Sequence, residues 1–246
     1  MDLSGAHAEM AARCHRDEEA AAIFAAYSLV IDGTLGPPSP GPCGTLRPAC
    51  LALVAEGLWS IAVDDHGNGL LATILAAAEP NAFMYTPGHN GRNGRLHHTL
   101  LQLISMRHYD AMPPEDVEAV TDAAVAALPA WRAAFAPPWT VVFDRLCLTP
   151  SGLVALGAPD RAYNTLRDFV RSSGLVKHEY HPQNICHCTL FRWHSRPSIA
   201  AFQNLQRLVN QWNAQKTIAC VFTATDVAVY KGTWEMTAVS GATRIA

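Results

Sequence analysis

Two stretches of the chain repeat one pattern: Leu96-His97-His98-Thr99-Leu100 and Cys186-His187-Cys188-Thr189-Leu190. Each places a His-x-Thr triplet among apolar residues at the start of a predicted strand. Because strand side chains alternate between two faces, the histidine and the threonine of one triplet are expected to point the same way. If the two strands lie side by side, two imidazoles that titrate near neutrality converge with two hydroxyls. Such a set is suited to acid–base cleavage of a phosphodiester without a metal. Alternatively, these are ordinary strand residues, with threonine favoured by its β-propensity and histidine by a buried hydrogen bond.

The residues that follow each triplet also repeat a pattern. After the first triplet, residues 114–134 predict a helix, and residues 139–157 predict two strands joined by a turn. After the second, apolar residues at helical spacing predict a helix over 198–212, followed by strands over 217–225 and 227–239. This order predicts an internal duplication whose pseudo-twofold symmetry would bring the two triplets to a shared cleft.

The rest of the chain is less regular. Residues 1–50 predict an N-terminal helical extension that ends in a Pro/Gly-rich loop, and residues 51–246 form the predicted main domain. Residues 51–63 are apolar, and a helix leading into a short strand is one interpretation that periodicity does not settle. Helices are predicted over 70–78 and 159–173, and residues 81–87 predict a strand.

The composition limits the class of protein. Half of the 246 residues are hydrophobic, which is enough for a substantial core. The formal net charge of −3 gives no basic field for long duplex nucleic acid. No apolar run is long enough to span a membrane, and the first residues lack the pattern of a secretory signal. Seven cysteines without framework spacing predict reduced thiols, and hence a cytoplasmic protein.

With these motifs the sequence resembles the 2H phosphoesterase superfamily, which includes LigT-like 2′-5′ RNA ligases and 2′,3′-cyclic phosphodiesterases. Two His-x-Thr/Ser motifs in two similar lobes define that family, and the resemblance covers residues 80–240. The run His187-Cys-Thr-Leu-Phe-Arg192 adds an arginine at an offset often found in the LigT branch. Residues 143–157 are similar to the family's central hairpin. The N-terminus departs from familiar members, which usually begin with a strand.

The resemblance implies an α+β fold of two pseudo-symmetric lobes, each an antiparallel sheet with outer helices. It also implies a phosphoric diester hydrolase that needs no metal or cofactor and acts on a nucleotide, an oligonucleotide or an RNA end. The favoured substrates are 2′,3′-cyclic phosphates and 2′-5′ linkages. In this interpretation His97 and His187 are the general acid and base, and Thr99 and Thr189 donate hydrogen bonds to the phosphate.

Further residues are candidates for substrate binding. Arg192 would clamp a phosphate, although simple alternation places it opposite His187 unless a bulge intervenes. The aromatic candidates for stacking on a base are Tyr85, Trp193 and Tyr230, each of which is also an ordinary packing residue. His98 alternates to the face opposite His97 and is interpreted as structural.

Other functions stay open. A cyclic dinucleotide is a further possible substrate, and a non-catalytic nucleotide-binding module of the same fold is the main alternative. Cys186-His187-Cys188 is no metal site in this interpretation, because consecutive strand residues alternate faces. We expect a monomer with no membrane association.

Overall fold

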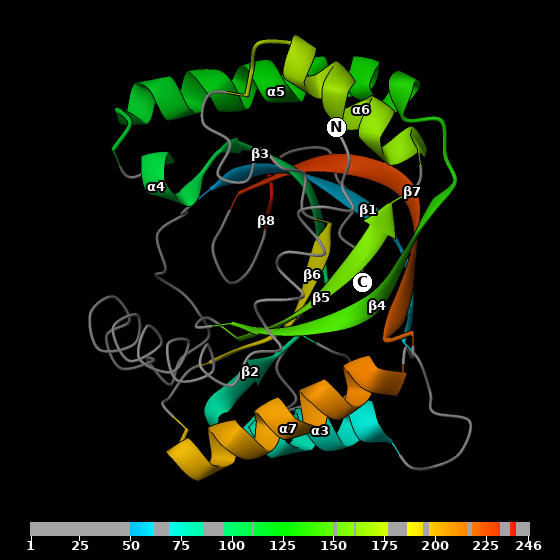
Figure 1. Cartoon of the computed structure of the whole chain (residues 1–246). Helices are drawn as coiled ribbons and strands as arrows, with labels where there is room; N and C mark the ends of the chain where they lie inside the picture. Colours follow the sequence, from blue (N-terminus) through cyan, green and yellow to red (C-terminus); the bar gives the residue numbers. More distant parts are fainter. Residues whose placement is uncertain are drawn as a thin grey trace.

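The protein has an α+β fold built on one antiparallel sheet (Figure 1). The computed structural model describes residues 50–61, 69–85, 96–109, 111–149, 152–159, 161–176, 186–193, 197–215, 218–231 and 237–239. Its strands are β1 (Leu51–Ile61), β2 (Ala82–Met84), β3 (His98–Ile104), β4 (Trp139–Thr149), β5 (Gly152–Pro159), β6 (His187–Trp193), β7 (Cys220–Lys231) and β8 (Thr237–Ala238). Among these residues the strand order is β2-β6-β5-β4-β7-β1-β3, and β8 pairs with β7. The predicted α+β class with an antiparallel sheet is confirmed.

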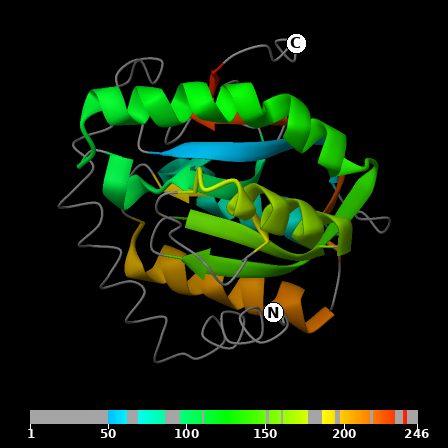
Figure 2. The same cartoon turned by 90° about the horizontal axis from the view of Figure 1, so that it is seen from above.

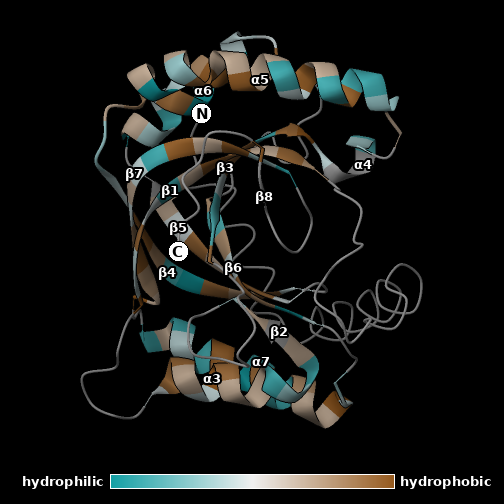
Figure 3. Ribbon diagram, turned by 180° about the vertical axis from the view of Figure 1, so that it is seen from behind, coloured by the Kyte–Doolittle hydropathy of each residue, from teal (hydrophilic) through white to brown (hydrophobic). Residues whose placement is uncertain are grey.

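Four of the helices form two pairs that lie at opposite ends of the molecule (Figures 1 and 2), and both pairs pack in one core on the same face of the curled sheet. The described helices are α3 (Leu70–Ala78), the 3-10 turn η1 (Glu79–Asn81), α4 (Met106–Tyr109), α5 (Pro114–Phe135), α6 (Arg161–Ser172) and α7 (Ile199–Gln215). Helix α5 packs with α6 and contacts β7, whereas α7 packs with α3 and contacts β4. Helices α5, α6 and α7 are each coloured both apolar and polar in Figure 3, as expected for helices that cover a sheet on one side only.

The main core lies between the sheet and the two helix pairs. Its largest fully buried side chains are aromatic, including Trp131, Trp139, Phe143, Trp193 and Phe222. Aromatic rings bury large areas, so they supply much of the apolar burial that offsets the ordering of the chain. Two smaller buried clusters lie on strands β1, β4 and β5, outside this main core.

The strand pairing shows a duplication that extends beyond the two triplets. On β1, the run Leu53-Val54-Ala55-Glu56-Gly57 pairs with β7 in the same register in which Leu153-Val154-Ala155-Leu156-Gly157 of β5 pairs with β4. Both pairings contain one bulge, and it falls at the same place, at the residue that follows the partner of each glycine. Strand β1 therefore corresponds to β5, and β7 corresponds to β4.

This correspondence corrects the predicted repeating unit. The sequence suggested a His-x-Thr strand, a helix and a strand pair, but β5 begins the second unit rather than closing the first. Each unit is strand, helix, His-x-Thr strand, helix and strand, and the two units exchange their last strands: β4 pairs with β5, and β7 pairs with β1. The hairpin over 139–157 thus connects the units.

Two other predictions change. The strand pair over 217–225 and 227–239 is wrong, because β7 runs unbroken from Cys220 to Lys231 through residue 226, where the two strands were predicted to separate. The helical interpretation of residues 51–63 is wrong as well, because Leu51–Ile61 is a strand paired on both sides. The predicted N-terminal helical extension lies outside the described residues.

Candidate functional site

The histidine and the threonine of the second triplet share one face of the sheet. Residues opposite each other on neighbouring strands point to the same side, and His187 lies opposite Leu156 while Thr189 lies opposite Val154. Leu156 and Val154 alternate along β5 on one face. They pack with Cys147 in a small buried cluster separate from the main core. We call this side of the sheet the motif face.

The first triplet occupies the same face in the other half of the sheet. Thr99 lies opposite Val54, just as Thr189 lies opposite Val154, and both pairs adjoin a bulge at the leucine after the threonine. Val54 packs with Cys50 and Ala52 in a second small cluster on the motif face. His97 precedes β3 by one residue, and alternation places it with Thr99. Both triplets are thus presented in equivalent positions.

The bulge in β6 decides where Arg192 points. Simple alternation would place it opposite His187, but the extra residue between the partners of Leu153 and Val154 shifts the alternation by one. Arg192 lies opposite Gly152, which shares its face with Val154. The arginine therefore joins Thr189 on the motif face. Burial raises the pKa of the Cys50 thiol, and the positive charge of Arg192 lowers it, so the two residues interact electrostatically.

The strands that carry the two triplets come together because the sheet curls. Strands β3 and β6 contact each other, although the sheet path separates them. The Nδ1 atom of His98 lies 2.9 Å from the carbonyl oxygen of His187. Tyr85 provides a second link, because its backbone N–H donates to the carbonyl of Leu190 and its ring meets His97 edge-on, with centroids 6.1 Å apart. The triplets are therefore neighbours, as the duplication predicted.

His98 faces the main core and not the motif face. Its side chain is fully buried, stacks on Tyr163 with ring centroids 5.3 Å apart, and meets Phe143 and Phe222 edge-on. Burial lowers the pKa of His98 from 6.5 to about 4, against the effect of its hydrogen bond to His187, and the charges of Arg167 and His97 lower it further. The imidazole is therefore neutral near pH 7.

A stability measurement tests this burial. The unfolded chain takes up a proton on His98 near pH 6.5 and the folded chain only near pH 4, so stability is lost as the pH falls through this window. By linkage, the free energy of unfolding is expected to fall by about 2 kcal/mol between pH 8 and pH 5 on account of this group. Urea denaturation of the wild type and His98→Leu over this range should show a smaller pH dependence in the variant. Identical pH dependences would contradict a neutral, buried His98.

The two halves of the motif face differ in their polar side chains. In the first half, the hydroxyl of Tyr230 donates to Glu56 Oε1 at 2.7 Å. The equivalent positions in the second half hold Thr149 and Leu156. Glu56 was not predicted from the sequence as a site residue. The Leu-Val-Ala-x-Gly run that repeats at residues 53–57 and 153–157 is the sequence signal that marks its position. Gln102 stands where the second half has Arg192, because it lies opposite Ala52 after the corresponding bulge.

Two of the three aromatic candidates lie in the interior. Tyr85 is 1% exposed and Trp193 is 2% exposed. Trp193 packs on Phe191 and Phe202, and its indole N–H donates to the carbonyl of Thr149. The prediction that these two rings offer a face to a base is therefore wrong for this structure, because the ring just after β2 and the ring at the end of β6 fill the core. Tyr230 is partly buried on the motif face.

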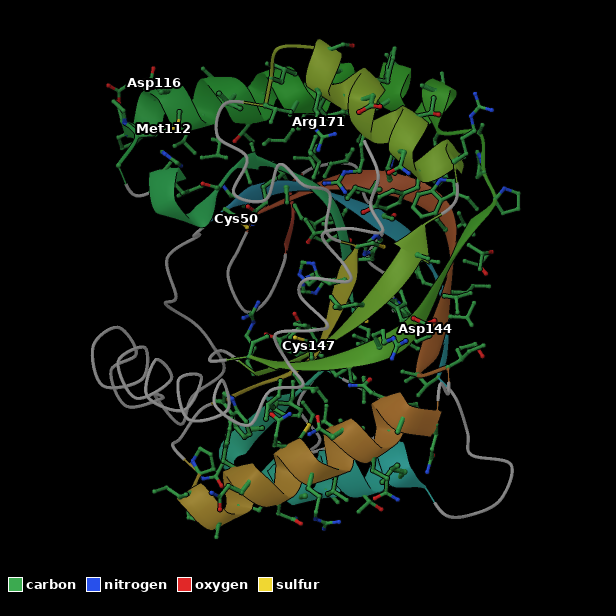
Figure 4. The ribbon with its side chains drawn as sticks, viewed as in Figure 1. Cys50, Met112, Asp116, Asp144, Cys147 and Arg171 are labelled. Atoms are coloured by element: carbon green, nitrogen blue, oxygen red, sulfur yellow. The ribbon has the colours of Figure 1, made fainter. Side chains whose placement is uncertain are left out.

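One of the described cysteines departs from the expected reduced state. Cys147, on β4, is disulfide-bonded, whereas Cys50, Cys186, Cys188 and Cys220 are not in disulfides. Figure 4 shows where Cys50 and Cys147 lie. Cys186 and Cys188 are fully buried on the core side of β6, and His187 points to the motif face between them. Within the described part of the chain, no three His, Cys, Asp or Glu side chains are grouped as metal ligands.

Comparison with known proteins gives no further assignment. No protein-family model matches this chain, and no curated protein is significantly similar to it. Over the described residues, none of the helices has the length and apolar character needed to cross a membrane.

Proposed function

We propose that the protein is a metal-independent phosphodiesterase of the 2H type, with two pseudo-symmetric lobes, that hydrolyses nucleotide or RNA-end phosphodiesters. The observation that carries the proposal is the equivalence of the two triplets: Thr99 and Thr189 lie opposite Val54 and Val154, beside matching bulges, on one face of a sheet whose triplet strands touch. Chance placement of two unrelated strand histidines would not reproduce the register and the bulge together.

The chemistry uses the two histidines as an acid–base pair. In hydrolysis of a 2′,3′-cyclic phosphate, one imidazole takes a proton from the attacking water as the new P–O bond forms. The other, protonated, gives its proton to the ribose oxygen as the P–O bond to that oxygen breaks, so the product is a ribose hydroxyl and a phosphate monoester. Thr99 and Thr189 donate hydrogen bonds to the non-bridging oxygens, where negative charge builds in the transition state.

The proposal is tested by turnover of a small substrate panel in excess EDTA. The panel holds the four 2′,3′-cyclic mononucleotides, a 2′-5′-linked oligoadenylate and two cyclic dinucleotides. We expect EDTA-resistant turnover with a bell-shaped pH dependence of kcat/KM, because one imidazole must be neutral and the other charged. Turnover that EDTA abolishes would contradict the acid–base mechanism, and the preferred member of the panel identifies the substrate class.

Arg192 is expected to act in binding rather than in proton transfer. Removing a guanidinium that pairs with a phosphate should cost about 1.5 kcal/mol or more, so Arg192→Ala should raise KM about 10-fold with a smaller change in kcat. Steady-state kinetics on the preferred substrate measure the two effects separately. Arg171→Ala is a matched control, because Arg171 pairs with Asp168 on helix α6, away from the motif face (Figure 4). An unchanged KM in Arg192→Ala would remove Arg192 from the site.

The second candidate is a nucleotide-binding module without turnover. The Tyr230–Glu56 pair favours it, because this pair places a carboxylate, an acceptor suited to a base edge, on the motif face. Tight binding of a panel member by calorimetry, with no product formed, would support this candidate against the hydrolase.

A further inference from the structure

His98 occupies an unusual place between the two triplets. It belongs to the first triplet, yet its side chain reaches the main chain of the second, with Nδ1 2.9 Å from the His187 carbonyl oxygen. Strand β6 pairs with β5 on one edge and with β2 on the other, but β2 pairs only with residues 191–193 of β6, and β6 also contacts β3. The carbonyl of His187 accepts its hydrogen bond from a side chain of β3.

The geometry fixes the tautomer of His98. A carbonyl oxygen only accepts, so Nδ1 must carry the hydrogen, and in a neutral ring Nε2 then accepts. The sulfur of Cys186, which is not in a disulfide, lies 3.7 Å from Nε2, so its S–H can donate to that atom. Cys186 is in turn hydrogen-bonded to Tyr163, whose hydroxyl accepts from Arg167 at 3.4 Å. The donors thus run in one direction from helix α6 to His187.

We propose that His98 is a positioning residue, whose Nδ1–H bond to the His187 carbonyl holds the second triplet in place against the first. The series of hydrogen bonds from Arg167 through Tyr163 and Cys186 holds the imidazole in the tautomer that makes this bond. The inference rests on the proposed function, since it concerns the spacing of the two histidines that share the proton transfers. Errors of about 1 Å in such spacing cost up to about 100-fold in rate.

The duplication supplies a matched control. Cys188 occupies the position in β6 that His98 occupies in β3, one residue before the threonine, and it is equally buried. Its Sγ lies 3.8 Å from Sγ of Cys220, the first residue of β7, within the main core. This side-chain contact is thus not with the main chain of the other triplet. The side-chain hydrogen bond between the triplets is therefore present in one half of the fold only. Cys188→Ala perturbs the core but leaves that hydrogen bond in place.

The kinetic test compares three variants on the preferred substrate. His98→Leu removes the donor and should lower kcat about 10- to 100-fold with KM changed less than about 3-fold. His98→Asn places an amide N–H near the position of Nδ1 and should recover most of the loss, and Cys188→Ala should stay within about 2-fold of wild type. Wild-type kcat in folded His98→Leu, equal losses in the leucine and asparagine variants, or an equal loss in Cys188→Ala would each overturn the proposal.

A second measurement needs no turnover, and its first part uses the wild type alone. NMR of ¹⁵N-histidine-labelled wild type should show His98 as the Nδ1–H tautomer without titration between pH 6 and 8. The titration of His187 should shift in His98→Asn or His98→Leu and not in Cys188→Ala. The charged and titratable groups that interact with His98 are His97, Arg167, Cys186 and Tyr163. An Nε2–H tautomer would overturn the positioning role, whereas absence of turnover with the expected tautomer would overturn the proposed function alone.

Discussion

Alanine in place of His97 or His187 is expected to lower kcat for a 2′,3′-cyclic mononucleotide by about 10³-fold, equivalent to about 4 kcal/mol of transition-state stabilisation. Each imidazole is assigned one proton transfer, and water is a poor substitute because it must be ordered and carries the wrong pKa. The two losses should not add in the double variant, because the pair acts as one unit. Single-turnover and steady-state assays of the purified variants measure the effect.

The pH profiles of the two variants add an assignment. Loss of the general base should remove the acidic limb of the bell, and loss of the general acid should remove the basic limb. His108→Ala serves as the matched control, because His108 bonds to the hydroxyl of Ser105 at 2.8 Å on helix α4, away from the triplets. If either folded single variant keeps kcat within about 10-fold of wild type, that histidine does not carry a proton in the reaction.

Gly57→Ala is expected to lower the free energy of unfolding by about 3 kcal/mol, the upper end of the usual cost of overpacking. A Cβ at this position would overlap the carbonyl oxygen of Thr223 and lie 2.8 Å from the Cα of Ala224. These are backbone atoms of β7, so the strand itself must move, and it does so beside the bulge that sets the register of β1. Urea denaturation of both proteins, with unchanged m-values, measures the difference.

The duplicated glycine and the next residue supply controls. At Gly157 an added Cβ would meet the side chains of Phe143 and Val141 and the carbonyl of Val142, all at 2.8 Å. Because side chains yield more easily than a strand, Gly157→Ala should cost less, about 1 to 2 kcal/mol. Leu58→Ala should change stability by less than about 0.5 kcal/mol, since Leu58 is 73% exposed. A Gly57→Ala protein as stable as Leu58→Ala would contradict the close approach of β1 and β7.

Local sequence patterns predicted several elements correctly. The helix expected over 70–78 has those bounds in the structure, and the hairpin over 139–157 and the helices near 114–134 and 198–212 are present. In each of these the apolar spacing, the turn residues or the acidic first turn acts within a few residues. Such signals are local, so they survive without knowledge of the fold.

Where prediction failed, a distant partner decided the outcome. Residues 51–63 are apolar throughout and fit a helix or a strand, and pairing with β3 and β7 made Leu51–Ile61 a strand. Asp226 resembles a turn residue, yet it lies within β7, where its carboxylate accepts from Arg132 on α5 at 2.9 Å. Trp193 and Tyr85 offered aromatic rings of the right chemistry, and the core used them for packing.

The sequence by itself determined the chemical inventory of the candidate site: two His-x-Thr triplets, each with both side chains on one strand face, because a strand repeats every two residues. Only the tertiary structure decided that β3 and β6 touch, that bulges bring Arg192 to the motif face, and that His98 joins the two triplets. Those three features depend on register between strands far apart in the chain. A register shift of one residue moves a side chain to the opposite face, and no local pattern specifies it.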